Sequence, residues 1–122
     1  MTLRVDKVSI PVRDQERALR FYRDVLGFEV TTDAPFGEGQ RWIEMRAPGQ
    51  DTGIVLFTAP GQESRVGTFQ HVLFTAPDVQ AAYEALKAKG VVFTLPPKKE
   101  PWGISAVFQD VDGNSFSLAS SP

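Results

Sequence analysis

The feature of this 122-residue sequence that most constrains its fold is an internal repeat of one pattern, strand–helix–strand–strand–strand. Residues 7–14 align with residues 71–78 at an offset of 64, and Gly27 aligns with Gly90 at an offset of 63. Self-similarity at a nearly constant spacing indicates a duplicated unit. The alternative is that two unrelated strand–helix units look alike because such units share the same alternation and the same caps.

Alternation and end signals place the elements of the first half. Residues 5–12 alternate apolar and polar side chains, which predicts a half-buried strand. Asp14 is the predicted N-cap of a helix, and Gly27 is the residue that ends it. Three further strands, separated by turns rich in Pro and Gly, are predicted at Phe28–Thr32, Arg41–Ala47 and Gly53–Thr58.

The second half repeats this plan. A strand at Phe69–Ala76 precedes a helix at Val79–Lys89, which is capped by Asp78 and ended by Gly90. The last strands are predicted at Val91–Leu95, Ile104–Phe108 and Asn114–Ala119. The sequence therefore predicts an α+β fold of two tandem βαβββ modules. The predicted boundaries are a single domain over 1–122, with modules at 1–60 and 67–122 and a linker at 61–66.

Composition excludes several classes of function. The 13 Lys and Arg residues against 15 Asp and Glu residues give a net charge of −2, which argues against a nucleic-acid partner. The chain has no cysteine, so neither disulfides nor thiolate metal sites are available. The sequence shows neither an apolar run of membrane-spanning length nor a secretory signal, so we expect a cytoplasmic protein with no membrane partner. His71 is the single histidine, and we expect no cofactor.

Two motifs connect the repeat to a known family. The first helix carries the pattern Asp14, Ala18, Phe21, Tyr22, Leu26, Gly27 and Phe28, and the last strand follows Asp110, Asp112, Gly113 and Asn114. With these motifs in this order, the chain resembles the vicinal oxygen chelate superfamily, which includes glyoxalases, dioxygenases and bleomycin resistance proteins. The resemblance implies that the two βαβββ modules form curved, mostly antiparallel sheets around a cleft, which holds metal, substrate or drug. It also implies a homodimer, as in many short members.

Metal-dependent members of this superfamily carry one ligand on the first strand and one on the last strand of each module, typically His, Glu or Gln. The resemblance assigns these positions to Lys7, Leu56, His71 and Ser117. A divalent metal needs several imidazole or carboxylate ligands, and only His71 suits it, with Glu44 as a possible addition. We therefore expect no metal site, and the chain is closest in character to the metal-free ligand-binding members.

Strand alternation then selects the side chains that would line the cleft. One face of each sheet must pack its apolar residues under a helix, so the opposite face is available to a ligand. Aromatic residues in the duplicated Pro-aromatic-Gly loops would contact a planar or apolar molecule. The predicted ligand-binding residues are Lys7, Ser9, Phe36, Trp42, Leu56, His71, Trp102, Ser115 and Ser117.

Several of these residues have a second interpretation. Lys7 either binds a negative group of the ligand or pairs with Glu44 and solvent. His71 either contacts the ligand, acting as a general base in an enzyme, or is a buried and hydrogen-bonded remnant of a metal site. Phe36 and Trp102 either hold the ligand or cap the edge of the cleft or the dimer interface.

These observations predict a metal-free small-molecule-binding protein, in which a homodimer sequesters a partly aromatic antibiotic or metabolite in its cleft. The alternative is a glyoxalase-like lyase or isomerase that uses His71 or Glu44 as its base, with Lys7 stabilising an oxyanion. A third class is an interaction scaffold whose cleft has closed.

Overall fold

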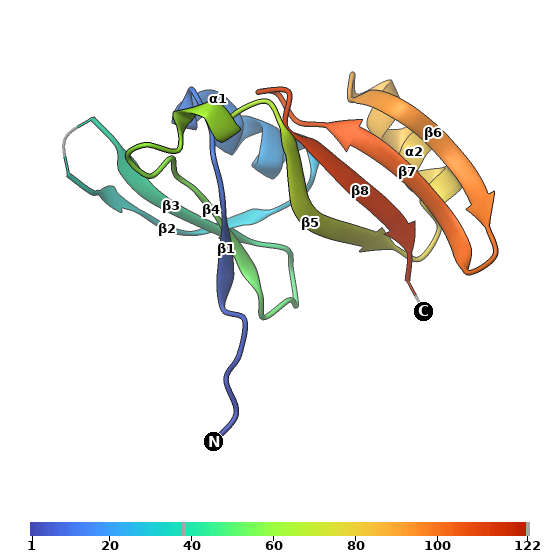
Figure 1. Ribbon diagram of the computed structural model, residues 1–122, viewed down its shortest axis with the longest axis horizontal. Coiled ribbons are helices and arrows are strands. Elements are labelled where there is room, and N and C mark those ends of the chain that lie inside the picture. The colour runs from blue at the N-terminus through green and yellow to red at the C-terminus, as the bar shows by residue number, and fades with distance from the viewer. Residues whose placement is uncertain (38, 122) are drawn as a thin grey trace. The chain divides into compact units, whose positions relative to one another are not determined.

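The computed structural model describes residues 1–37 and 39–121, and the chain forms two compact units, Met1–Val66 and Gly67–Pro122 (Figure 1). In the first unit, a four-stranded sheet has the order β1-β4-β3-β2, with β1 parallel to β4 and the other pairs antiparallel. Its elements are β1 (Lys7–Ile10), α1 (Gln15–Arg20), β2 (Glu29–Pro35), β3 (Arg41–Arg46) and β4 (Gly53–Leu56).

The second unit repeats this topology in a sheet of order β5-β8-β7-β6, with β5 parallel to β8. Its elements are β5 (Phe69–Ala76), α2 (Val79–Ala88), β6 (Val92–Glu100), β7 (Gly103–Gln109) and β8 (Ser115–Ser120). The prediction of an α+β fold with two βαβββ halves is therefore confirmed. A short 3₁₀ turn, Glu63–Arg65, lies near the C-terminal end of the first unit. No helix in the described part of the chain is long and apolar enough to cross a membrane.

Both helices begin and end at the predicted residues. The carboxylate of Asp14 accepts a hydrogen bond from the backbone N–H of Arg17, and that of Asp78 accepts one from Ala81, each at 3.0 Å. Gly27 and Gly90 follow the helices with φ angles of +80° and +91°, which glycine adopts without the steric cost that a Cβ would bring. The first helix differs in one respect, since α1 continues as a π-helical turn over Phe21–Val25.

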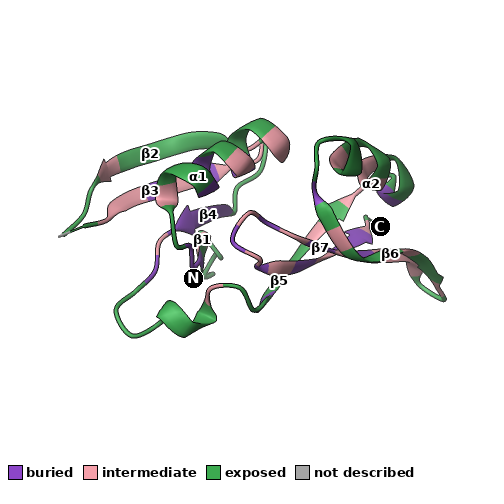
Figure 2. Cartoon of the chain, turned by 90° about the horizontal axis from the view of Figure 1, so that it is seen from above, coloured by how far each residue is buried: buried purple, intermediate pink, exposed green. Residues whose placement is uncertain are grey.

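The core of the first unit lies on the α1 side of its sheet. Ile10 is the register partner of Leu56 in the parallel β1–β4 pair, and both are fully buried, as is Met45. α1 contributes the buried Ala18 and Leu19 to the same core. Figure 2 shows the buried residues of β4 as a continuous stretch.

The position predicted for Leu56 is therefore wrong. The predicted ligand-binding role of Leu56 requires the face away from the helix. Its pairing with Ile10 instead puts Leu56 against the helix, and Val55 takes the other face. β4 is buried at all four positions, so its apolar run carries no alternation from which to read the phase. Only the hydrogen-bonded register shows which residue faces α1.

The core of the second unit is aromatic. Phe74 of β5 lies 5.1 Å from Phe116 of β8, and Phe116 lies 5.6 Å from Phe108 of β7, all as ring-centroid distances. Tyr83 of α2 makes an edge contact at 4.7 Å with Phe93 of β6, which connects the helix to this layer. Alternation then leaves the other face of β5 and β8 free of the helix.

β6 is longer than predicted. The predicted strand ends at Leu95, but β6 continues through Pro96 and Pro97 to Glu100. Prolines cannot donate to a sheet, so they are tolerated at an edge or at an irregularity. β6 is the outer strand of its sheet, and its register with β7 shifts between Leu95 and Lys98, where the two prolines lie.

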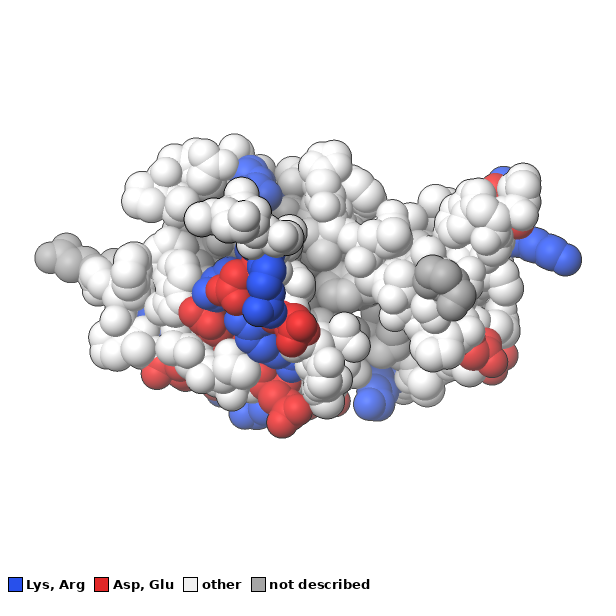
Figure 3. Space-filling model, turned by 90° about the horizontal axis from the view of Figure 1, so that it is seen from below, with Lys and Arg blue, Asp and Glu red and all other residues white. Residues whose placement is uncertain are grey.

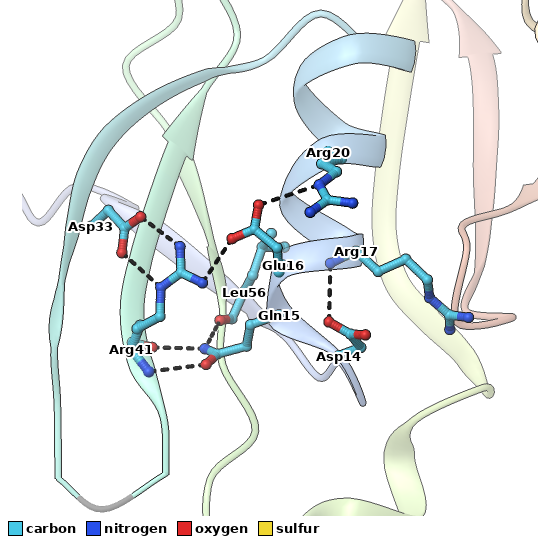
Figure 4. Close-up of polar contacts among 8 residues, drawn as sticks. All are labelled: Asp14, Gln15, Glu16, Arg17, Arg20, Asp33, Arg41 and Leu56. Atoms are coloured by element: carbon cyan, nitrogen blue, oxygen red, sulfur yellow. Dashed lines mark hydrogen bonds and ion pairs between the residues drawn. The ribbon is translucent and has the colours of Figure 1, made fainter.

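Arg41 ties β3 to β2 and α1. Its guanidinium donates to both carboxylate oxygens of Asp33, at 3.0 and 2.7 Å, and to Glu16 at 3.0 Å (Figure 4). The Gln15 side chain donates to the carbonyls of Arg41 and Leu56, both at 2.7 Å, and thereby links the ends of β3 and β4. These contacts hold the start of β3 next to Trp42.

We expect the Arg41 contacts to make stability depend on pH below neutrality. Hydrogen bonds from Arg41 lower the pKa of Asp33 and of Glu16 below their ordinary values of 3.8 and 4.5. A lowered pKa stabilises the fold above the unfolded-state pKa, and this contribution is lost as the pH falls through the folded-state pKa. In urea unfolding at several pH values, Arg41→Met should therefore lose less stability than the wild type on acidification below pH 4.5.

The matched control for this measurement is Arg13→Met, which removes an exposed cation that has no ion pair among the described residues. It should leave the acid dependence unchanged. If the free energy of unfolding of Arg41→Met fell with pH as steeply as that of the wild type, these ion pairs would contribute nothing measurable to stability.

Candidate functional site

Three aromatic side chains gather on the face of the first sheet that lies away from α1, which we call the helix-free face. The ring centroids of Phe36, Trp42 and Phe57 lie 5.2 to 5.3 Å apart in every pair, and we call this group the aromatic cluster. Register explains the arrangement. Glu44 pairs with Val55 across β3 and β4, so the residues two positions further out, Trp42 and Phe57, share their face.

The cluster is accessible although its rings contact one another. Phe36 is 52% exposed, and Trp42 and Phe57 are half-buried. Large apolar side chains are seldom so exposed in a group unless the group contacts a partner or a ligand. This ring contact brings together two of the predicted ligand-binding residues, Phe36 and Trp42.

A polar chain continues from the cluster along the same face. The indole N–H of Trp42 donates to Oε1 of Glu44 at 2.7 Å, and this oxygen lies 3.5 Å from Nζ of Lys7 on β1. The Glu44 side chain is only 18% exposed. The hydrogen bond fixes the orientation of the Trp42 ring, so the indole presents a defined surface.

Lys7 is held by two carboxylates. Its ammonium donates a hydrogen bond to Asp6 as well as lying beside Glu44, and Arg46 contacts the other oxygen of Asp6 at 3.0 Å. The hydrogen bond to Asp6 raises the pKa of Lys7, and the same bond is the largest cause of the lowered pKa of Asp6. Lys7 is therefore a charged ammonium at neutral pH. Figure 3 shows basic and acidic side chains interleaved rather than separated on the face it draws.

The second unit presents its own helix-free face. His71 on β5 is exposed, and its ring lies 5.3 Å from that of Phe69. The imidazole ring of His71 has no hydrogen bond within the described part of the chain. His71 is therefore not a buried, hydrogen-bonded remnant of a metal site. Ser117 pairs with Leu73 of β5 and is half-buried, as is Ser115.

The two aromatic loop residues differ in their surroundings. Phe36 packs in the aromatic cluster, whereas Trp102, in the turn between β6 and β7, is 65% exposed and contacts no other ring among residues 1–37 and 39–121. Ser9 on β1 is also exposed. These residues remain predicted contacts of a ligand.

The residues at the metal-ligand positions do not fit a divalent metal. In the first unit these positions hold Lys7 and, after the correction of the β4 face, Val55 instead of Leu56. Lys7 is a cation and Val55 has no donor atom, while His71 and Ser117 of the second unit offer one imidazole and one neutral hydroxyl. Among the described residues, no group of three or more His, Cys, Asp or Glu side chains is arranged to hold a metal ion.

A separate hollow of about 770 Å³ lies in the first unit near the start of α1 and the loop that follows β4. Its polar side chains Gln40 and Thr58 are already engaged. The Gln40 amide bonds the backbone of Thr58 at 2.8 and 3.1 Å, and the Thr58 hydroxyl bonds the backbone of Val12. Arg13 also lines the hollow and has no ion pair among the described residues, but the lining contains no aromatic ring, so the aromatic cluster is the stronger candidate site for a partly aromatic ligand.

Sequence reasoning missed three residues of this site. Phe57 is absent from the predicted ligand-binding residues, and neither Asp6 nor Arg46 is predicted as a partner of Lys7. The strand register that places Phe57 beside Trp42 is a property of the folded sheet. For Asp6, direct adjacency to Lys7 was an available signal.

The paired βαβββ units and their capped helices define a class of fold, and comparison with known families agrees. Residues 4–118 match the model of the Glyoxalase/Bleomycin resistance protein/Dioxygenase superfamily. The chain belongs to this superfamily.

Solved structures and a curated relative show the same similarity over almost the whole chain. A superfamily member from Sphaerobacter thermophilus aligns with a TM-score of 0.89 and 33% identity, covering 98% of each chain. TnmS3, an antibiotic binding protein from Streptomyces sp. CB03234, aligns with a TM-score of 0.84 and 34% identity, covering 99% of this chain and 98% of that one. The Bacillus subtilis protein YetH is 30% identical over 118 residues, which cover 97% of this chain and 98% of YetH.

Proposed function

We propose that this protein binds a small, partly aromatic molecule, an antibiotic or a metabolite, without transforming it. The aromatic cluster of Phe36, Trp42 and Phe57 on the helix-free face is the observation that carries the proposal. Ligand sites are mostly apolar with a few placed polar groups, and here Glu44 and Lys7 supply those groups beside the rings. The similarity to TnmS3, an antibiotic binding protein, supports the same function.

The enzyme alternative needs a positioned base. Glu44 accepts a hydrogen bond from Trp42 and lies beside the Lys7 ammonium, so its Oε1 is already engaged. His71 contacts the ring of Phe69 and has no orienting hydrogen bond among the described residues. A general base is usually oriented by a second group. The arrangement therefore supports binding over catalysis.

Three measurements test the proposed function. Native mass spectrometry of the protein purified without denaturation should reveal an associated small molecule with an aromatic group. That molecule should quench the fluorescence of Trp42 when it is added back to stripped protein, and it should be recovered unchanged after long incubation. Recovery of a chemically altered molecule would instead support the lyase or isomerase alternative.

We expect the purified protein to hold no stoichiometric divalent metal, because Lys7 and Val55 supply no metal ligand in the first unit. Elemental analysis after purification, with Ni, Zn, Fe and Mn measured together, checks this expectation. About one metal ion per chain that is lost in His71→Ala would contradict it. The control variant is Glu63→Gln, which changes an exposed carboxylate in the 3₁₀ turn.

We also propose that the protein is a homodimer. Phe69 and Leu73 on β5 are 48% and 61% exposed, and an apolar surface of this kind is covered in many assemblies. Sedimentation equilibrium at micromolar concentration should give twice the 13.5 kDa chain mass. A mass of one chain throughout this range would refute the dimer while leaving the binding proposal intact.

A further inference from the structure

We infer that the site on the helix-free face of the first unit selects an uncharged or cationic aromatic molecule and discriminates against an anionic one. This inference rests on the proposed function and narrows its ligand class. It decides between the two interpretations of Lys7, whose ammonium would otherwise be the obvious partner for a carboxylate or phenolate. Three features of the site support it.

The first feature is the balance of charge beside the aromatic cluster. Lys7 has Asp6 and Glu44 as partners, and Arg46 bonds the carboxylate of Asp6 at 3.0 Å and its backbone carbonyl at 3.2 Å. Two cations and two carboxylates therefore compensate each other. An anion that approached Lys7 would meet the negative charges of both its partners, so the ammonium offers little net attraction.

The second feature is the use of the indole donor. The N–H at the edge of an indole ring is the group of Trp42 that would donate to an anion. Here it already donates to Oε1 of Glu44 at 2.7 Å. To use this donor, an anionic ligand would have to displace the carboxylate of Glu44, whose side chain is only 18% exposed.

The third feature is the surface that the rings present. Aromatic faces carry partial negative charge, so they attract cations and repel anions placed above them. Oε2 of Glu44 receives no hydrogen bond from any residue in the described ranges, so it is available to a ligand that donates one. Arg41, which precedes Trp42, does not change this balance because it is bound to Asp33 and Glu16.

The test uses three matched probes with one ring system: naphthylmethanol, naphthylmethyltrimethylammonium and naphthalenesulfonate. The chain has 2 Trp residues, so two indole N–H signals are expected in a heteronuclear NMR spectrum, and Trp102→Phe assigns the signal of Trp42. Each probe is titrated into the full chain, and its Kd is taken from the shift of the Trp42 indole signal.

We expect the neutral and cationic probes to bind about two- to fivefold more tightly than the anion, which is the range that partly exposed charges contribute. Glu44→Gln keeps the size of the side chain and an acceptor for Trp42 but removes one negative charge. It should narrow this difference by raising the affinity for naphthalenesulfonate. High salt should narrow it too, because exposed charges are screened.

The matched control is Glu84→Gln, which removes the same charge from an exposed position on α2 and should leave all three Kd values unchanged. Equal or tighter binding of naphthalenesulfonate would overturn the inference and leave the proposed function standing. If no probe shifts the Trp42 signal at millimolar concentration, the aromatic cluster is not a ligand site, and both proposals fall.

Discussion

Leu56→Ala should lower the free energy of unfolding by about 2–5 kcal/mol, the range for truncating a fully buried leucine. Leu56 has no exposed surface, and its register partner Ile10 is equally buried. Replacing it leaves a cavity between the sheet and α1, because neighbouring strands and a helix cannot collapse fully into the space. Urea unfolding followed by circular dichroism measures this loss.

Ser117→Ala is the contrasting variant. Ser117 is half-buried on β8 and its side chain makes no hydrogen bond within the described ranges, so loss of the hydroxyl should change stability by about 0.5 kcal/mol or less. The resemblance assigns Leu56 and Ser117 to equivalent positions on the last strands of the two modules, but the strand registers place them on different faces of their sheets. Similar small effects from both variants would mean that Leu56 does not face the core.

The reason for this separation shows what a single sequence can and cannot predict. In β1 and β8, polar residues alternate with apolar ones, so the faces of Lys7 and Ser117 can be predicted by inspection. In β4 every residue is apolar and buried, so both phases fit the sequence equally well. The choice between Val55 and Leu56 depends on which backbone groups pair with β1, and this information is absent from the local pattern.

The helix ends belong to the predictable part of the fold. A capping aspartate acts on a backbone N–H three residues away, and a glycine with positive φ acts on its own position. Asp14 and Gly27 therefore act through contacts that lie close together in the sequence. Contacts of this kind can be predicted before any tertiary structure is known.

The candidate site likewise has residues that the sequence predicts and contacts that only the folded sheet creates. Phe36 and Trp42 are both predicted as ligand-binding residues from the sequence, and they lie only six positions apart. Phe57 joins them only through the pairing of β3 with β4. The chemistry of Lys7 likewise depends on Glu44 and on Asp6, whose second oxygen is held by Arg46 from another strand. Charge compensation of this kind is a tertiary property, which explains why the sequence left the role of Lys7 open.

Truncating the aromatic cluster should weaken ligand binding far more than it weakens the fold. With naphthylmethanol as the probe, Phe36→Ala should lower affinity by about 5- to 150-fold, which corresponds to losing roughly 1–3 kcal/mol of ring contact. Phe36 is 52% exposed, so its removal should cost about 1 kcal/mol of stability or less. Trp102→Ala, at a residue that is 65% exposed, should affect stability even less, and it weakens binding only where Trp102 also contacts the ligand.

Phe116→Ala provides the structural contrast, because Phe116 is fully buried between Phe74 and Phe108. It should lower the free energy of unfolding by about 3–5 kcal/mol while the remaining folded protein binds with unchanged affinity. Binding is measured by titration and stability by urea unfolding on the same preparations. If Phe36→Ala destabilises the protein as much as Phe116→Ala does and leaves affinity for the probe unchanged, the aromatic cluster supports the fold and does not bind the ligand.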